Sequence, residues 1–268
     1  MVTARARNKY GDYTNDRLFI ISIGKCFHLL ECFNIAQRPL TLSELAKTAN
    51  FTTSTVQRLT HTLCRLGYLR QHPRTRAYVL SSKMLEFSHS VLAANEVREI
   101  AEPHLRLLNR ESKETVNLME LEGEEIVYVS RFTSTHPVSV NLHVGSRLPA
   151  FCSAAGRAML AHLAPEAAQA ILAKRRVAMT KYTVTDLKAL HTILDRARRD
   201  MFVINDQEAY LGDISVAAPI FDRDGGVCSA INIAVPSSRW TVARVKKELA
   251  PMVLQCARRI SRDIDSRN

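Results

Sequence analysis

The sequence predicts an α+β protein in which a winged helix-turn-helix is followed by a linker helix and a C-terminal α/β domain with an antiparallel sheet. Two short amphipathic helical patterns joined by a tight turn lie in the first third of the chain. A pair of short strand patterns around a basic turn comes directly after them. Alternating strand patterns flanked by helical ones fill the remainder, which is typical of an α+β domain.

Length and composition limit the possible classes of protein. With 268 residues, 46% of them hydrophobic, the chain can form packed cores in one or two domains. No apolar run approaches the roughly 18 residues of a membrane span, and the basic N-terminus lacks the apolar stretch of a signal peptide. The 6 cysteines form no CxxC pair or zinc-ligand spacing, which indicates reduced thiols. We therefore expect a cytoplasmic protein without membrane contact.

Positive charge is concentrated in the first third of the chain. The formal net charge is +11, and residues 1–82 hold 12 basic and 4 acidic side chains, whereas the rest hold 25 and 22. Such asymmetry favours a polyanionic partner, most often nucleic acid. Charge alone fits a solvated basic surface as well as a nucleic-acid-binding one. The helical pattern distinguishes these two interpretations.

The first predicted domain contains three helices. Residues 20–32 carry apolar side chains at helical spacing, and Pro39 ends that pattern. The second helix is expected to run to Ala49, with Thr41 or Ser43 as its N-cap. A short turn separates it from a third helix, whose buried stripe is expected to be Val56, Leu59, Leu63 and Leu66. Two short helices joined in this way indicate a helix-turn-helix.

The opposite face of the third helix is polar and basic, which suits a recognition helix. The side chains expected to contact DNA there are Thr53, Ser54, Gln57, Arg58 and His61. Glutamine can pair with adenine and arginine with guanine through two hydrogen bonds each. Several of these residues also have structural interpretations: Thr52 or Thr53 as a plain N-cap, and His61 as a contact to the DNA backbone or to solvent.

A basic turn after the third helix predicts the wing. Residues 68–70 and 77–80 form short strand patterns, and Arg74 and Arg76 lie in the turn that joins them. Arginines at such a tip are expected to lie against phosphates or in the minor groove.

The rest of the chain predicts a linker and an antiparallel sheet. Residues 82–111 are expected to be helical with an interruption at Pro103, and Glu122-Gly123-Glu124 predicts a hairpin turn. A further strand is expected over residues 137–144. The predicted limits are 1–17 for a flexible basic N-terminus, 18–82 for the winged helix-turn-helix, 83–100 for the linker helix and 101–268 for the C-terminal domain.

Two long segments of the C-terminal domain resemble a known family. Residues 145–161 (GSRLPAFCSAAGRAMLA) and 205–236 (NDQEAYLGDISVAAPIFDRDGGVCSAINIAVP) are similar to the signatures of the IclR family of transcription regulators, and the resemblance spans roughly residues 18–262. It implies a GAF-like C-terminal domain that binds a small organic acid as effector. It also implies a homodimer or homotetramer on a palindromic operator in double-stranded DNA.

Three short features resemble the aromatic-acid catabolism regulators within that family. They are Asp206-Gln207-Glu208, the strand Ser-Val-Ala-Ala-Pro from Ser215, and Arg239-Trp240-Thr241. The resemblance implies an effector such as protocatechuate, 4-hydroxybenzoate or a ring-cleavage product such as β-ketoadipate. It implies control of catabolic genes.

Strand alternation gives an independent prediction of the effector pocket. In the last strand Cys228, Ala230, Asn232 and Ala234 should share one face, opposite a bulky face of Ile231, Ile233 and Val235. Small residues with one amide suit a ligand pocket, and Ser215 and Ala217 repeat the pattern in the preceding strand.

The resemblance adds further pocket positions. It implies that Ala154 and Ala155 present backbone N–H groups to a carboxylate, because they open a helix whose dipole favours anions. The matched lining positions are Asn205, Ser215, Asn232 and Ala234, and Val140 and Leu148 are expected as apolar walls. Asn232 and Ala234 stand where relatives often have serines, and Asn205 where an acid is common, which leaves the effector's identity open. Asn232 could also be a buried amide satisfied by backbone, and Ser215 a structural hydroxyl.

Two alternative functions are less well supported by the sequence. An enzyme could use Cys152 with His162, but ten residues along a helix separate them by roughly 15 Å, too far for a base to activate a thiol. No glycine-rich nucleotide loop or metal cluster occurs, so we expect no catalytic residues, no cofactor and no metal site. A ligand-independent DNA-binding repressor with a degenerate sensor domain remains the main alternative.

Overall fold

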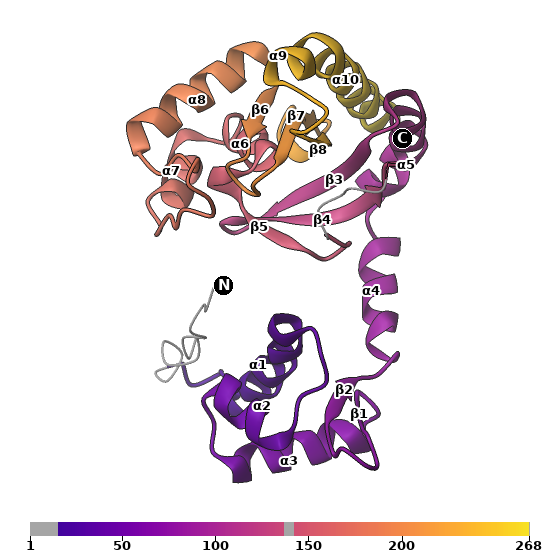
Figure 1. The fold of residues 1–268 in the computed structure, drawn as a ribbon, viewed down its shortest axis with the longest axis vertical. Coiled ribbons are helices and arrows are strands. Elements are labelled where there is room, and N and C mark those ends of the chain that lie inside the picture. Colours follow the sequence, from indigo (N-terminus) through magenta and orange to yellow (C-terminus); the bar gives the residue numbers. More distant parts are fainter. Residues whose placement is uncertain (1–15, 137–141, 268) are drawn as a thin grey trace. The chain divides into compact units, whose positions relative to one another are not determined.

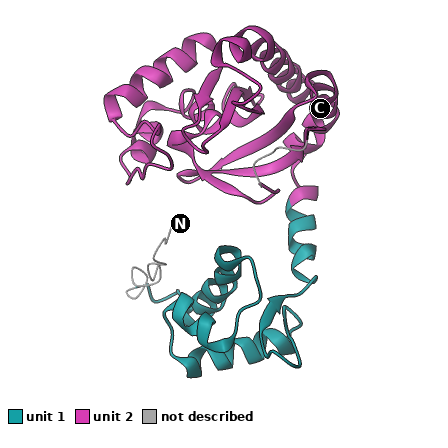
Figure 2. Cartoon of the chain, viewed as in Figure 1, with its two compact units in different colours: residues 1–91 teal, residues 92–268 magenta. Residues whose placement is uncertain are grey.

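The computed structural model describes residues 16–136 and 142–267, which form two compact units. Unit 1 covers residues 1–91 and unit 2 residues 92–268 (Figure 2). The sequence predicts a separate linker helix over residues 83–100. In the structure the boundary between the units falls within that stretch. None of the helices in the described ranges is both long and apolar enough to cross a membrane.

Unit 1 packs three helices around one small core. The helices are α1 (Ile21–Ala36), α2 (Leu42–Ala49) and α3 (Thr53–Arg65). Thr41 caps α2 and forms a capping box with Glu44, which decides between the two predicted N-caps. Leu29, Leu45 and Val56, one from each helix, are fully buried in the common core. The apolar faces of the three helices thus meet in one core and form the predicted helix-turn-helix.

The buried stripe of α3 is shorter than the sequence predicted. Val56 and Leu63 are buried and Leu59 is partly buried, but Leu66 is 55% exposed. The prediction was wrong for Leu66, which is the C-cap just after the last helical residue, Arg65.

The wing is a two-stranded antiparallel sheet of β1 (Leu69–Gln71) and β2 (Tyr78–Leu80). An isolated bridge from Leu40 to Tyr78 ties this sheet to the segment between α1 and α2. Helix α4 (Met84–Ala93) then leaves the wing.

The break in the following helical segment lies at residues 94–95. Helix α5 (Glu96–Ser112) continues through Pro103, so the predicted interruption there was wrong. The Asn95 side chain accepts a hydrogen bond from the Arg98 backbone N–H at 2.8 Å and so starts a new helix. The N-cap therefore sets the break.

Unit 2 is built on a six-stranded antiparallel sheet with the strand order β5-β4-β3-β8-β7-β6 (Figure 1). Its strands are β3 (Thr115–Glu122), β4 (Glu125–Phe132), β5 (Arg147–Pro149), β6 (Val203–Asp206), β7 (Asp213–Phe221) and β8 (Val227–Pro236). Most of the strand predicted over 137–144 lies outside the described residues. The described residues 142–144 are not in a strand, whereas β5 is a short strand that the sequence analysis did not predict.

Helices cover both faces of this sheet. Helix α5 and the C-terminal helix α10 (Ala250–Ser266) pack on one face. Helices α6 (Ala154–Leu160) and α8 (Leu187–Asp200) belong to the core on the other face. The remaining helical segments are α7 (Pro165–Leu172), α9 (Val242–Arg244), a 3-10 turn at Ala150–Cys152 and a π-helical turn at Val245–Leu249. Two cores thus sandwich one sheet.

The alternation predicted for β8 holds except at one residue. Ile231, Ile233 and Val235 pack toward α5 and α10, whereas Ala230 packs on the α6 side. Cys228 was expected beside Ala230 but packs on the opposite face. The reason is a register shift between β7 and β8 next to Cys228, because an extra residue at a bulge inverts the faces beyond it.

Candidate DNA-binding surface and effector cavity

The outer side of α3 carries the side chains predicted to contact DNA. All five are exposed: Thr53, Ser54, Gln57, Arg58 and His61. Thr60 on the other side is fully buried, and its hydroxyl donates to the Val56 carbonyl at 2.9 Å. The helix therefore presents a polar face without interruption.

The hydroxyl groups at the start of α3 have different roles. Thr52 is the N-cap, and its side chain accepts from the Thr55 backbone N–H. The Thr52 and Thr55 hydroxyls also lie 2.9 Å apart. Thr53 and Ser54 are not needed for the cap, which leaves their hydroxyls available at the helix N-terminus.

The wing turn is held by His72. Its Nδ1 accepts hydrogen bonds from the backbone N–H groups of Arg74 at 3.3 Å and Thr75 at 3.2 Å. The Gln71 side chain donates to the Arg76 carbonyl at 3.0 Å, and Arg76 adopts a φ of 57°. Both arginine side chains are exposed, as expected for a wing tip.

Unit 2 contains a cavity of about 370 Å³ on the α6 side of its sheet. Six of the predicted pocket residues line it: Leu148, Ala154, Ala155, Ser215, Asn232 and Ala234. Val140 lies outside the described residues. Asn205 does not line the cavity. Small-molecule sites have volumes of roughly 300–1,000 Å³, so this cavity suits a compact ligand.

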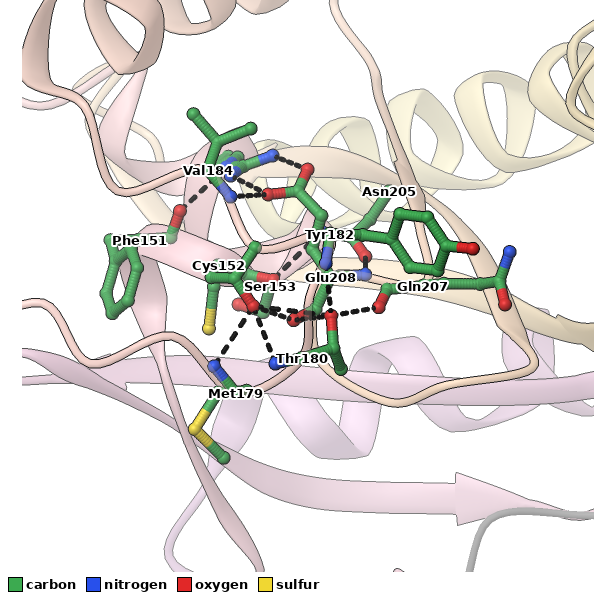
Figure 3. A network of polar contacts seen from close by, with 12 residues as sticks. Phe151, Cys152, Ser153, Met179, Thr180, Tyr182, Val184, Asn205, Gln207 and Glu208 are labelled. Carbon is green, nitrogen blue, oxygen red and sulfur yellow. Dashed lines mark hydrogen bonds and ion pairs between the residues drawn. The ribbon is translucent and has the colours of Figure 1, made fainter.

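Asn205 forms part of a polar network behind the cavity (Figure 3). Its Nδ2 donates to the Cys152 carbonyl at 2.8 Å, and its Oδ1 accepts from the Glu208 backbone N–H at 3.2 Å. Both ends of the amide are thus used within the protein. Asn205 joins β6 to the 3-10 turn before α6, which makes it a positioning residue.

The strongest interaction in this network is a buried ion pair. Arg157 is 1% exposed and donates two hydrogen bonds to Glu208, at 2.5 and 2.6 Å. Its Nε also donates to the Phe151 carbonyl at 2.7 Å. Glu208 in turn accepts from the Val184 backbone N–H at 2.8 Å. Arg157 therefore pairs within the protein, and so does exposed Arg147 with Glu122 and Glu125.

Three further polar residues in one row across the sheet reach the cavity. Arg131, Asn117 and Asn232 are direct cross-strand neighbours on β4, β3 and β8. Arg131 donates to Asn117 Oδ1 at 3.0 Å, and Asn117 Nδ2 donates to Asn232 Oδ1 at 2.7 Å.

The donor-only guanidinium fixes the orientation of both amides. Arg131 requires the oxygen of Asn117, so Asn117 offers its NH2 group and Asn232 must accept with its oxygen. The Asn232 NH2 group then has no acceptor among the described residues, although Asn232 is only 5% exposed. This NH2 group belongs to a residue that lines the cavity. The alternative of an amide satisfied by backbone does not apply to this NH2 group.

The sequence analysis did not identify the other polar lining residues. Burial raises the pKa of Asp213 to about 7, and the nearby Arg131 charge opposes that shift. Burial and the Asp213 charge also raise the pKa of the Tyr128 and Tyr210 phenols. The only available signal was the alternation of β7, where Asp213 shares a face with Ser215.

Cys152 and His162 do not form a nucleophile–base pair. Burial raises the pKa of the Cys152 thiol to about 12, and its Sγ contacts the Pro149 carbonyl. Burial and the Arg198 charge lower the pKa of His162. Within the described ranges no group of His, Cys, Asp and Glu could hold a metal ion.

A winged helix-turn-helix followed by a cavity-containing α/β domain defines a class of DNA-binding transcription regulators. Family models match both parts of the chain: the IclR helix-turn-helix domain over residues 22–73, and the bacterial transcriptional regulator IclR C-terminal domain over residues 89–262. The chain therefore belongs to the IclR family of bacterial transcription regulators.

Individual relatives agree with this assignment. The Pca regulon regulatory protein of Pseudomonas putida is 29% identical over 259 residues, which cover 96% of this chain and 88% of the relative. A putative transcriptional regulator from Rhodococcus sp. RHA1 is 30% identical, with a TM-score of 0.81 over 93% of this chain and all (100%) of that chain. An IclR homologue from Microbacterium hydrocarbonoxydans, crystallised with 4-hydroxybenzoate, shares the fold at 24% identity, with a TM-score of 0.78 over 92% of this chain and 100% of that chain.

We expect Glu208→Gln to lower the free energy of unfolding by about 3–5 kcal/mol, because it leaves the buried Arg157 charge without a counter-charge. Urea denaturation followed by circular dichroism measures this. As a matched control, Glu122→Gln removes an exposed partner of Arg147 and should cost less than about 1 kcal/mol. Equal losses in the two variants would contradict the central role of the buried pair.

We expect Asp213→Asn to change how stability depends on pH. The carboxyl has a pKa of 3.8 when unfolded and about 7 when folded, so the folded state binds more protons between these values. Wild-type stability should therefore fall as pH rises from about 4 to 7, relative to the variant. Thermal unfolding across this range measures the difference, and Asp224→Asn in the exposed β7–β8 turn is the control. Parallel curves for wild type and Asp213→Asn would refute the shifted pKa.

Proposed function

We propose that this regulator binds a specific operator in double-stranded DNA through α3 and the wing, and that a small organic acid in the unit 2 cavity controls this binding. The effector is an aromatic acid or a ring-cleavage product, and the regulated genes are catabolic. The observation that carries the effector proposal is the cavity itself, where Asn232 lines the wall and its NH2 group has no acceptor in the described structure.

The division of roles on the DNA follows from position. Gln57 and Arg58 lie on the exposed face of the first turns of α3, where they can read base edges in the major groove. Thr53, Ser54 and His61 are proposed to contact the backbone or flanking bases. Arg74 and Arg76 at the wing tip are proposed to neutralise phosphates.

Cavity chemistry supports an acid as the effector. Donors converge from three elements: Asn232 on β8, the Ser215 hydroxyl on β7 and the backbone N–H groups that begin α6 at Ala154. Leu148 and Ala234 supply apolar walls. A relative named for the Pca regulon and a protein of the same fold crystallised with 4-hydroxybenzoate are consistent with an aromatic acid.

Exposed apolar residues on unit 1 support a homodimer, or a homotetramer built from dimers. Ile23 and Phe27 on α1 are 50% and 61% exposed, and Leu85 and Val91 on α4 are 66% and 67% exposed. Apolar side chains gathered on helices in this way often mark protein interfaces. A two-fold symmetric dimer would match a palindromic operator.

We expect Arg58→Ala and Gln57→Ala each to weaken binding to the selected operator about 5- to 150-fold, because a bidentate base contact contributes about 1–3 kcal/mol. Operators can be selected from fragmented genomic DNA, and affinities measured by fluorescence anisotropy.

Arg74→Ala should differ from these two variants, because Arg74 is proposed to contact phosphate and not bases. Loss of a phosphate contact should weaken specific and non-specific binding alike and reduce the salt slope by about 1. Arg199→Ala, an exposed arginine on α8, is the control with no expected effect. If Arg58→Ala weakened binding equally on all sequences, α3 would not be the reading helix.

We expect aromatic acids to raise the melting temperature of the wild type and Asn232→Asp to abolish that effect. The substitution keeps the oxygen that accepts from Asn117 but replaces the free donor with a charged oxygen that repels an acid. The matched control is Asn34→Asp, which places the same new charge at an exposed position on α1 in unit 1. If no acid raised the melting temperature of the wild type, the ligand-independent repressor would be favoured.

We expect Phe27→Glu combined with Val91→Glu to convert the dimer to monomer, because charges would replace the exposed apolar side chains. Analytical ultracentrifugation of the full chain measures the mass. A wild type that is monomeric at micromolar concentration would refute the assembly proposal.

A further inference from the structure

Three charged residues line the cavity: Glu114, Arg131 and Asp213. One of them, Asp213, has no hydrogen bond or ion pair to its side chain among the described residues. Glu114 is held by the Trp240 indole N–H at 2.9 Å and by Arg239 at 2.8 Å. Its charge is therefore already satisfied within the protein.

Asp213 differs because no hydrogen-bond donor to its carboxylate is found in residues 16–136 and 142–267. No hydrogen bond or ion-pair contact to its side chain exists among the described residues. The groups that act on it electrically are Arg131 and Tyr128 from β4 and Tyr210 from the segment before β7. A desolvated carboxylate without a donor is unfavourable, and its pKa of about 7 reflects that cost.

The strand register limits how far the Asp213 carboxylate can lie from the Asn232 NH2 group. Asp213, Ser215 and Ala217 share one face of β7, and Ala217 pairs directly with Asn232. Asp213 and the Asn232 row are thus four residues apart, at most about 13 Å along the strand. A benzene ring with a carboxylate and a para hydroxyl, plus a hydrogen bond of about 2.8 Å at each end, spans ~12 Å.

We propose that Asp213 is a specificity-determining residue that selects effectors with a hydrogen-bond-donating hydroxyl in addition to their carboxylate, that is, hydroxylated aromatic acids. The inference rests on the proposed function, since it assumes that an acid occupies this cavity. It narrows that function because it disfavours the dicarboxylic ring-cleavage products.

The preference follows from charge. A ring hydroxyl can donate a hydrogen bond to the Asp213 carboxylate, which has no donor in the described part of the chain. A second carboxylate would instead meet a like charge, or would require that Asp213 take up a proton. The Arg131 charge lowers the pKa of Asp213, but burial outweighs it and leaves that pKa raised. A hydrogen bond to a charged group contributes enough to change affinity by about 10- to 150-fold.

Isothermal titration calorimetry on the full-length protein at pH 8 tests the proposal. The ligands are benzoate, 3- and 4-hydroxybenzoate, 3,4-dihydroxybenzoate and benzene-1,4-dicarboxylate. We expect at least one hydroxylated acid to bind at least tenfold tighter than benzoate, and the dicarboxylate to bind more weakly than benzoate. In Asp213→Asn and Asp213→Ser the affinity advantage of the hydroxylated acid over benzoate should fall below threefold. Asp224→Asn should behave as wild type.

The pH dependence gives a second readout with opposite signs for the two ligand classes. Between pH 6 and 8 wild-type affinity should rise for a hydroxylated acid and fall for the dicarboxylate, and both trends should vanish in Asp213→Asn. Equal affinities for benzoate and hydroxybenzoates, or tighter binding of the dicarboxylate, would overturn the role of Asp213 and leave an acid-binding cavity intact. If none of these acids bound, the aromatic-acid proposal and this inference would fail together.

Discussion

The buried Arg157–Glu208 pair is the interaction on which the cavity of unit 2 depends. Arg157 lies in α6, one turn beyond the residues that open that helix at the cavity wall. Glu208 directly precedes the segment 209–213, all of which lines the cavity. The pair therefore sets the distance between two walls that come from parts of the chain about fifty residues apart. Its low exposure and its additional bonds to Phe151 and Val184 mean that neither charge can turn to solvent.

The start of α6 packs closely against the 3-10 turn that precedes it. Gly156 approaches Ala150 so closely that a side chain there would collide with the backbone. The 3-10 turn, α6 and β6 are thus packed at backbone contact, with Asn205 bridging them. This packing explains why a motif that resembles a binding signature contains residues, such as Asn205, that position the site without reaching the cavity.

Local patterns predicted some parts of the structure well. The helix-turn-helix, the wing and the cavity face of β7 and β8 depend on periodicity within one element, which the sequence shows directly. Asn117, Arg131 and Tyr128 were missed because β3 and β4 are buried on both faces over much of their length, so alternation does not show which face meets the cavity. A register shift between Leu118 and Met119 also changes the pairing partway along. The NH2 group of Asn232, which has no acceptor among the described residues, could not be predicted. Its orientation depends on a row of three residues on three separate strands, which no local pattern contains.

The same strands that line the cavity also hold the start of α5, which follows α4 in the chain. Arg98 donates to the Val129 carbonyl at 3.2 Å, and Asn95 donates to Glu120 at 2.5 Å. Val129 lies between Tyr128, which lines the cavity, and the next cavity residue of β4, Arg131. A ligand that shifts β4 must therefore either carry the N-terminus of α5 with it or break these two bonds. Such a shift can alter DNA binding only if the ligand prefers one of the two arrangements, so the free energy of that preference sets the upper limit on control.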